Sequence, residues 1–149
     1  MKKATTHQPS QYHTVIPYIT VEDAAGLIDF LETVFEAKPG ECLKRPDGAI
    51  MHAELTIGDS TVMLADACEE MGPMPASLYV YVKDVDTTFQ RAVDAGATPI
   101  MPPADMFWGD RFCCVQDKWG NQWSPSTCVQ ELTPEEIEQG ARAFMEQQS

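Results

Sequence analysis

The chain has 149 residues, which is enough for one domain with a buried core. Its 23 acidic residues outnumber its 10 basic residues and give a formal net charge of −13, so nucleic acids and anionic membranes are unsuitable partners. Five cysteines without a CxxC pair predict neither a disulfide framework nor a structural zinc site. No apolar run follows the lysines near the N-terminus, so we expect no secretory signal and a cytoplasmic protein.

The first half of the sequence passes from a strand pattern to a helix and back to strands. Residues 1–12 are polar, and we expect a disordered tail there. An apolar strand pattern ends at Val21, and Asp23 is a suitable N-cap for a helix whose apolar residues follow helical spacing. Three strands are then predicted, with a Gly58-Asp59 turn between the last two: residues 38–44, 49–57 and 60–65.

The second half repeats this order about 60 residues later. Val82 and Asp84 correspond to Val21 and Asp23, and Gly96 ends the second helix as a C′ glycine would. Three further strands are predicted, the last two joined by a turn at 118–121: residues 98–101, 110–116 and 122–127. The chain therefore contains the pattern βαβββ twice.

A further helix is predicted after the second module. Thr133-Pro134-Glu135-Glu136 combines a Thr N-cap with Pro at N1 and Glu at N3. Ile137, Ala141 and Phe144 give this helix one apolar stripe, which must cover either the protein's own sheet or a second subunit. We expect a single domain over 13–128, with modules at about 13–66 and 77–128, followed by an amphipathic helix within 129–149.

A set of motifs follows the two modules in order: Pro17-Tyr18-Ile19, Met51-His52-Ala53-Glu54-Leu55, Gly58-Asp59, Val62-Met63-Leu64-Ala65-Asp66, Gly109-Asp110-Arg111 and Asp117-Lys118-Trp119-Gly120-Asn121-Gln122-Trp123-Ser124. With these motifs the chain resembles the vicinal oxygen chelate superfamily, and within it the PhnB-like glyoxalase/bleomycin-resistance group. The resemblance covers residues 13–128. It implies an α+β fold in which two tandem βαβββ modules form a half-barrel cup for a small ligand. It also implies a homodimer, because many members dimerise.

Alternation along the predicted strands separates a helix-facing side from a second side. The helix-facing set is predicted to be Ile19, Val21, Met51, Ala53, Leu55, Ile57, Leu78, Val80, Val82, Phe112, Cys114, Trp123 and Pro125. The second face then collects Tyr18, Thr20, His52, Glu54, Thr56, Ser77, Tyr79, Tyr81, Arg111, Cys113, Ser124 and Ser126. Tyrosines with one histidine and one arginine are typical of a pocket with few polar groups, although the same tyrosines can also fill a small barrel.

The resemblance also implies where a metal would bind. In metal-dependent members the ligands, usually His or Gln and then Glu, come from the first and last strands of each module. The corresponding positions in this chain are Ile16, Met63, Ser77 and Ser124. None of them offers a carboxylate or an imidazole, so we expect neither a metal nor another cofactor. A His52–Glu54 pair remains as a weak two-ligand signal.

The first functional hypothesis is a metal-free protein that binds a small molecule. Tyr18, Tyr79, Tyr81, Trp108 and Trp119 would stack on a planar or apolar ligand, and His52, Glu54 and Ser124 would complete the site. Arg111 would hold a carboxylate or a phosphate-like group, unless it pairs with Asp110, Glu54 or Asp66. Trp108 lies in a loop that would act as a lid or pack at a dimer interface.

The alternative hypothesis is a lyase or isomerase, glyoxalase-like, that acts on a small oxygenated metabolite. His52 would then be a general base with Glu54 or Tyr79 as its partner; otherwise it is a hydrogen-bonded pocket histidine. Cys113 is a candidate nucleophile, but no base at a fixed spacing supports that role. A third hypothesis is a dimeric assembly module whose cup is filled by side chains.

Overall fold

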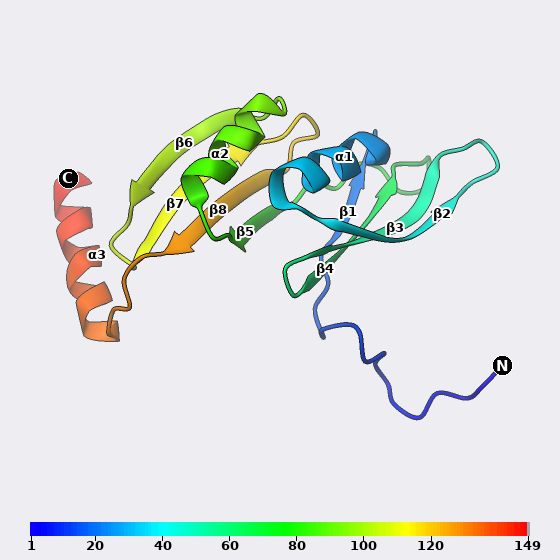
Figure 1. Cartoon of the computed structure of the whole chain (residues 1–149), viewed down its shortest axis with the longest axis horizontal. Helices are drawn as coiled ribbons and strands as arrows, with labels where there is room; N and C mark the ends of the chain where they lie inside the picture. The colour runs from blue at the N-terminus through cyan, green and yellow to red at the C-terminus, as the bar shows by residue number, and fades with distance from the viewer. Residues whose placement is uncertain (149) are drawn as a thin grey trace. The chain divides into compact units, whose positions relative to one another are not determined.

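The computed structural model describes residues 1–148, which form eight strands and three helices (Figure 1). In chain order these are β1 (Tyr18–Val21), α1 (Ala24–Phe35), β2 (Lys38–Lys44), β3 (Ile50–Ile57), β4 (Ser60–Asp66), β5 (Ser77–Tyr81), α2 (Val85–Asp94), β6 (Thr98–Asp105), β7 (Asp110–Gln116), β8 (Gln122–Cys128) and α3 (Pro134–Gln148). The chain divides into two compact units, Met1–Pro75 and a second unit that begins at Ala76. Each unit contains one βαβββ module.

Both units build the same four-stranded sheet. The strand orders are β1-β4-β3-β2 and β5-β8-β7-β6. The first strand of each module runs parallel to the last, and the other neighbours are antiparallel. The registers also correspond, since Tyr18 pairs with Met63 and Tyr79 pairs with Ser124. The α+β fold and the repeated module predicted from the sequence are therefore confirmed.

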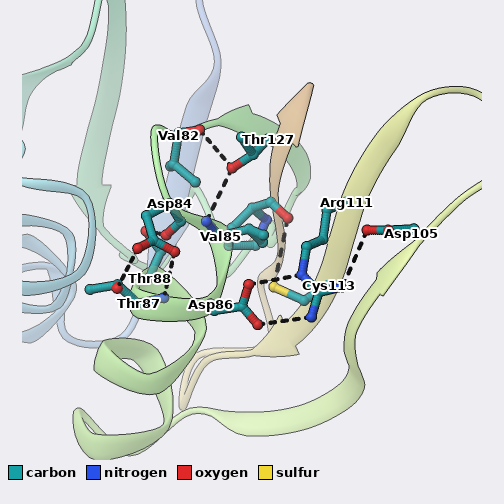
Figure 2. A network of polar contacts seen from close by, with 11 residues as sticks. Val82, Asp84, Val85, Asp86, Thr87, Thr88, Asp105, Arg111, Cys113 and Thr127 are labelled. Atoms are coloured by element: carbon teal, nitrogen blue, oxygen red, sulfur yellow. Dashed lines mark hydrogen bonds and ion pairs between the residues drawn. The ribbon is translucent and has the colours of Figure 1, made fainter. Parts of the chain in front are cut away.

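The two helices begin in the same way. The carboxylates of Asp23 and Asp84 accept hydrogen bonds from the amides of Gly26 and Thr87, at 3.0 and 3.2 Å, so both are N-caps as predicted. The end of the last strand of each module supplies a second acceptor. Asp66 Oδ1 accepts from the Ala24 amide at 2.8 Å, and Thr127 Oγ1 accepts from the Val85 amide at 3.1 Å (Figure 2). These bonds tie each helix to its own sheet, because they satisfy amides that a helix leaves free.

Each unit has a helix on one face of its own sheet (Figure 1). Fully buried apolar side chains fill the layer between helix and sheet: Ile19, Leu27, Leu31, Leu55 and Leu64 in the first unit, and Val85, Ala92, Val115 and Trp123 in the second. Burial of such side chains is the main stabilising contribution to folds of this size. The opposite face of each sheet is therefore the face left for a ligand.

The turn between β7 and β8 is organised around the buried carboxylate of Asp117. It accepts hydrogen bonds from the backbone amides of Trp119 and Asn121, from the Asn121 side chain and from Trp123 Nε1, at 2.8 to 2.9 Å. Gly120 has φ of +91°, a conformation that suits glycine. Trp123 is 0% exposed and lies on the helix side. This turn therefore holds the last strand, with Ser124 on the other face.

The predicted faces of β7 are wrong by one residue. We expected Phe112 and Cys114 to face the helix and Arg111 and Cys113 to face away. The register pairs Phe112 with Ser126 and Arg111 with Thr127, so Phe112 lies on the face of Ser126 and Arg111 on the helix face. Cys113 is fully buried, and its thiol contacts the Pro125 carbonyl at 3.6 Å.

A second correction concerns the start of β3. Met51 was predicted to pack against the helix, but it is 53% exposed, and Ile50 is buried instead. The pairing of β2 with β3 shifts its register between Leu43 and Lys44. A register irregularity of this kind moves a side chain to the other face. Ala53 and Leu55, beyond the shift, are buried as predicted.

The helix α3 begins with the predicted capping box. Thr133 Oγ1 accepts from the Glu136 amide at 3.2 Å, and the Glu136 carboxylate accepts from the Thr133 amide at 3.3 Å. The Phe144 ring lies 5.5 Å from the ring of Phe107, in the turn between β6 and β7. The apolar stripe of α3 therefore contacts its own unit, although Phe144 remains exposed. Among residues 1–148, no helix is long and apolar enough to cross a membrane.

Candidate functional site

In the first unit, the face opposite the helix carries a chain of hydrogen bonds centred on Glu54. His52 Nε2 lies 3.1 Å from Glu54 Oε2, and His52 Nδ1 lies 3.3 Å from the Tyr18 hydroxyl. His52 and Glu54 lie two positions apart on β3, so their side chains share one face. Tyr18 lies on β1, which β4 separates from β3, and it is 43% exposed. The structure therefore brings together three of the residues predicted from the sequence.

Tyr12 joins this group from the N-terminal segment. Its hydroxyl contacts both carboxylate oxygens of Glu54, at 2.7 and 2.9 Å. This hydrogen bond and the one from His52 hold the pKa of Glu54 below its ordinary value, because hydrogen bonds to the charged form favour it. The same bond raises the pKa of Tyr12. Glu54 is therefore ionised at neutral pH.

The ionised carboxylate decides which nitrogen of His52 carries the proton when the ring is neutral. A carboxylate only accepts hydrogen bonds, so Nε2, which faces Glu54, must be the donor. Nδ1 then presents its lone pair toward the Tyr18 hydroxyl. The arrangement resembles the way in which a carboxylate orients a histidine for proton transfer. Nδ1 can thus accept a hydrogen bond from Tyr18, or from a ligand that takes its place.

Glu41 lies close to the same group. One ligand atom from each of Glu41, His52 and Glu54 lies within 4.8 Å of the others. A cation bound there would need the lone pair of a histidine nitrogen, and Nε2 uses its proton to bind Glu54. Metal binding through Nε2 would therefore require the loss of the His52–Glu54 hydrogen bond.

The positions at which metal-dependent relatives place ligands do not fit a metal in this chain. Ile16 is apolar, Met63 offers a thioether, and Ser77 and Ser124 offer neutral hydroxyls. Divalent cations in such sites require imidazole nitrogen or carboxylate oxygen donors. The register places Met63 beside Tyr18 and Ser124 beside Tyr79. Two of these four positions, Met63 and Ser124, therefore pair with tyrosines on the neighbouring strand.

In the second unit, the same face is centred on Asp110. The hydroxyls of Tyr79 and Tyr81 both donate to Asp110 Oδ2, at 2.6 and 2.9 Å. Trp108 Nε1 donates to the Tyr79 hydroxyl at 3.0 Å. Asp110 is only 4% exposed, whereas Tyr81 is 65% exposed. A buried carboxylate is thus covered by two phenols that face outward.

Aromatic rings surround this carboxylate. Tyr79 stacks on Phe112 with ring centres 5.8 Å apart and an interplanar angle of 20°. Tyr81 meets Tyr79 edge-on at 5.5 Å, and Trp108 meets Phe112 edge-on at 5.7 Å. Such arrangements are the favourable geometries for aromatic pairs. The face therefore offers a rigid aromatic surface of the kind that stacks on planar ligands.

The hydrogen bonds to Asp110 change the acidity of both phenols. They raise the pKa of Tyr81 to about 12. The pKa of Tyr79 is raised first by burial and then by its bond to Asp110, and the nearby Ser126 hydroxyl opposes the increase. Both effects favour the neutral phenol, because ionisation beside a carboxylate is unfavourable. Neither tyrosine acts as a base at neutral pH.

Arg111 does not belong to this face, in contrast to the prediction. Its guanidinium binds Asp86 of α2 through two hydrogen bonds, at 2.8 and 3.0 Å, and Asp105 of β6 at 3.2 Å (Figure 2). The two carboxylates raise the pKa of Arg111 further. Its ion pairs thus differ from the alternatives considered from sequence, which were Asp110, Glu54 and Asp66. The guanidinium links a helix to a strand.

Cys113 is also removed from the uncovered face. Burial raises the pKa of its thiol to about 12, because a thiolate is unfavourable in an apolar interior. The thiol is therefore protonated at neutral pH. A nucleophilic role for Cys113 is not supported by its surroundings.

Sequence reasoning missed four residues of the two faces: Tyr12, Glu41, Asp110 and Phe112. Tyr12 was assigned to the N-terminal tail, and its contact with Glu54 spans 42 positions of sequence. Phe112 was assigned to the wrong face of β7, and Asp110 was assigned to no face. Their signal was the register with β8, where Phe112 pairs with Ser126. Glu41 lies on a strand with no clear alternation.

Residues 11–124 match the family described as the Glyoxalase/Bleomycin resistance protein/Dioxygenase superfamily. The chain belongs to this superfamily. A Mycobacterium bovis relative, the uncharacterized protein Mb0911c, is 38% identical over 133 residues, which cover 82% of this chain and 88% of the relative. The resemblance proposed from the sequence motifs is thereby confirmed.

Solved structures of the superfamily support the same fold. TioX from Micromonospora sp. ML1 is 29% identical, with a TM-score of 0.64 over 78% of this chain and 99% of TioX. A PhnB protein from Bacillus cereus, described as a putative 3-demethylubiquinone-9 3-methyltransferase, is 20% identical, with a TM-score of 0.63 over 77% of this chain and 99% of that protein. The second comparison shows the fold alone. A shared fold hosts many activities, so the function is argued from the residues.

Proposed function

We propose that this superfamily member is a cytoplasmic, homodimeric protein that binds a small molecule without the metal of its metal-dependent relatives. One observation carries the proposal. The positions where relatives hold a metal are Ile16, Met63, Ser77 and Ser124, while the same strands expose Tyr18, Tyr79 and Tyr81. This residue set lacks metal ligands and provides aromatic surface.

The proposed contacts divide between the two units. In the first unit, Tyr18 offers its ring, and His52 and Glu54 provide polar groups. In the second, Tyr79, Tyr81 and Trp108 provide a connected aromatic surface, with Ser124 beside Tyr79. Arg111 is left out, because two carboxylates already bind its guanidinium.

Ligand binding can be tested by thermal denaturation in the presence of planar aromatic compounds. Binding to the folded state raises the midpoint, and the stabilisation grows with the logarithm of the ratio of ligand concentration to dissociation constant. We expect a shift with at least one compound, and a reduced shift in Tyr79→Ala if the second sheet is the binding face. If no compound gives a shift and the tyrosines of a crystal structure fill the cup, a dimeric assembly module is the better description.

The metal-free claim needs its own measurement. Purified protein is analysed for zinc, nickel, iron and manganese before and after addition of each ion. We expect less than one equivalent of each to remain bound after gel filtration. Stoichiometric metal that is lost in His52→Ala and in Glu41→Gln would refute the claim and assign Glu41, His52 and Glu54 as ligands.

A second function is favoured by the hydrogen bond between His52 and Glu54. This bond leaves Nδ1 of a neutral His52 free to accept a proton beside Tyr18, as a lyase or isomerase acting on a small oxygenated metabolite would require. Proton abstraction next to a carbonyl can be followed as deuterium exchange of dihydroxyacetone in heavy water. Exchange above the buffer rate that disappears in His52→Gln would support an enzyme. Equal rates for both proteins would leave His52 as a binding residue only.

A further inference from the structure

We infer that the second sheet selects a planar ligand that carries a positive charge or N–H donors, and that Asp110, acting through Tyr79 and Tyr81, is the group that selects it. The inference rests on the proposed binding function and adds the chemical class of the ligand. It replaces the expectation that Arg111 would attract an anion.

The phenol and indole donors on this face are already engaged. The hydroxyl protons of Tyr79 and Tyr81 are directed to Asp110 Oδ2, and the Trp108 N–H is directed to the Tyr79 oxygen. The groups that remain outward are oxygen lone pairs and aromatic faces. A phenol that donates to a carboxylate is also a better acceptor, because hydrogen bonds in a chain polarise one another. The face is therefore built to accept hydrogen bonds from a ligand, and it offers an anion little.

The charge on this sheet points the same way. Arg111 is the only Lys or Arg in the four strands β5 to β8, all of which are described. Its guanidinium is held by Asp86 and Asp105 on the helix side. Asp110 thus has no cation among its hydrogen-bond partners, which are two neutral phenols. A buried carboxylate without a positive partner is completed by a cation more readily than by any other ligand group.

The rings around Asp110 suit such a cation. Tyr79, Tyr81, Phe112 and Trp108 form one connected group of aromatic contacts. The face of an aromatic ring attracts ammonium and guanidinium groups, and a nearby carboxylate adds to that attraction. Combined with stacking on a planar ligand body, this chemistry fits a protonated amine attached to an aromatic ring system.

Backbone geometry fixes the position of Asp110. Gly109, between Trp108 and Asp110, has φ of +102°, and its carbonyl accepts hydrogen bonds from the amides of Val129 and Gln130 at 2.9 and 3.0 Å. A side chain at this position would collide with the Gln130 carbonyl. The sharp bend at Gly109 lets the residues on either side of it, Trp108 and Asp110, both reach the Tyr79 hydroxyl.

The experiment uses three probes of one shape and different charge: 1-naphthylmethylammonium, 1-naphthylmethanol and 1-naphthoate. Affinity of the full-length protein for each is measured by titration calorimetry at neutral pH and low salt. We expect the ammonium probe to bind at least about 10-fold more tightly than the alcohol, and the carboxylate probe to bind most weakly. Asp110→Asn should remove the difference between ammonium and alcohol.

A matched control separates local from general electrostatics. Asp105→Asn removes one negative charge from the same sheet, but on a side chain that binds Arg111, so it should preserve most of the preference. Tyr81→Phe keeps the ring and removes the polarised oxygen, and it should reduce the preference without abolishing stacking. This variant also keeps the test valid if Asp110→Asn does not fold.

The outcomes distinguish the two proposals. If none of the three probes binds, the proposed binding of planar molecules fails. If all three bind equally, or 1-naphthoate binds most tightly, binding stands and the assigned charge preference is overturned. If Asp105→Asn abolishes the preference as completely as Asp110→Asn, the effect belongs to the overall charge of the protein, and Asp110 is not the selecting group.

Discussion

The two units share a fold and differ in what surrounds their central carboxylate. In the first, Glu54 makes hydrogen bonds with Tyr12 and His52, and the other ring nitrogen of His52 contacts the Tyr18 hydroxyl. In the second, Asp110 is bound by Tyr79 and Tyr81, without a titratable base among its partners. The first arrangement includes an imidazole beside its carboxylate, whereas the second surrounds its carboxylate with aromatic rings. The repeat therefore duplicated a scaffold while its two faces acquired different chemistry.

The cores differ as well, and one substitution should show this most strongly. Trp123 in the second unit corresponds in register to Val62 in the first, and both are buried. Trp123→Ala should lower the free energy of unfolding by about 3–5 kcal/mol, because it opens a cavity and leaves Asp117 without its indole donor. Val62→Ala should cost about 2 kcal/mol. Urea denaturation measures both, and an equal loss would contradict the greater dependence of the second unit on one side chain.

The next largest effect concerns the acidity of Tyr81. Asp110→Asn should return its pKa from about 12 toward the ordinary 10.0, about a 100-fold change in acidity. Because the folded-state pKa is raised, the stabilisation is present below pH 10 and is lost as the pH rises from about 10 to about 12. A titration of ring-labelled tyrosine followed by NMR gives the value. Glu54→Gln is the control, and it should leave Tyr81 unchanged.

A smaller effect is expected on the histidine of the first unit. Glu54→Gln replaces an obligatory acceptor by an amide that can also donate, so neutral His52 should no longer be held with its proton on Nε2. Nitrogen chemical shifts of labelled histidine report the tautomer directly. Asp110→Asn should not alter it. A wild-type ring that already mixes both tautomers would contradict the orienting role of Glu54.

The smallest expected change follows removal of the Tyr12 hydroxyl. Tyr12→Phe should raise the pKa of Glu54 toward 4.5, because Tyr12 is the main cause of its lowering. A lowered folded-state pKa stabilises the protein above the ordinary value, and that contribution is lost as pH falls through the folded-state pKa. The variant should therefore be slightly less stable at neutral pH and equal to wild type in acid. Carbon NMR of the carboxyl group, with Tyr18→Phe as control, measures the shift.

The sequence predicted the repeated module, both helix N-caps and most strand faces, because these depend on local periodicity. Asp23 and Asp84 stand directly before apolar stripes, and Tyr79 and Tyr81 alternate cleanly with Leu78 and Val80. Family membership followed from the order of the motifs.

Tertiary structure alone decided which residues meet. The segment Asp110–Gln116 contains apolar and polar residues without strict alternation, so only its pairing with β8 determines that Asp110 and Phe112 join the tyrosines and that Arg111 turns to Asp86. Tyr12 reaches Glu54 across 42 positions, a contact that no local pattern encodes. Periodicity specifies a side chain's face only within its own strand, whereas hydrogen-bond register between strands specifies its neighbours. The choice of Asp110 rather than Arg111 as the charged group of the second face is a consequence of that register.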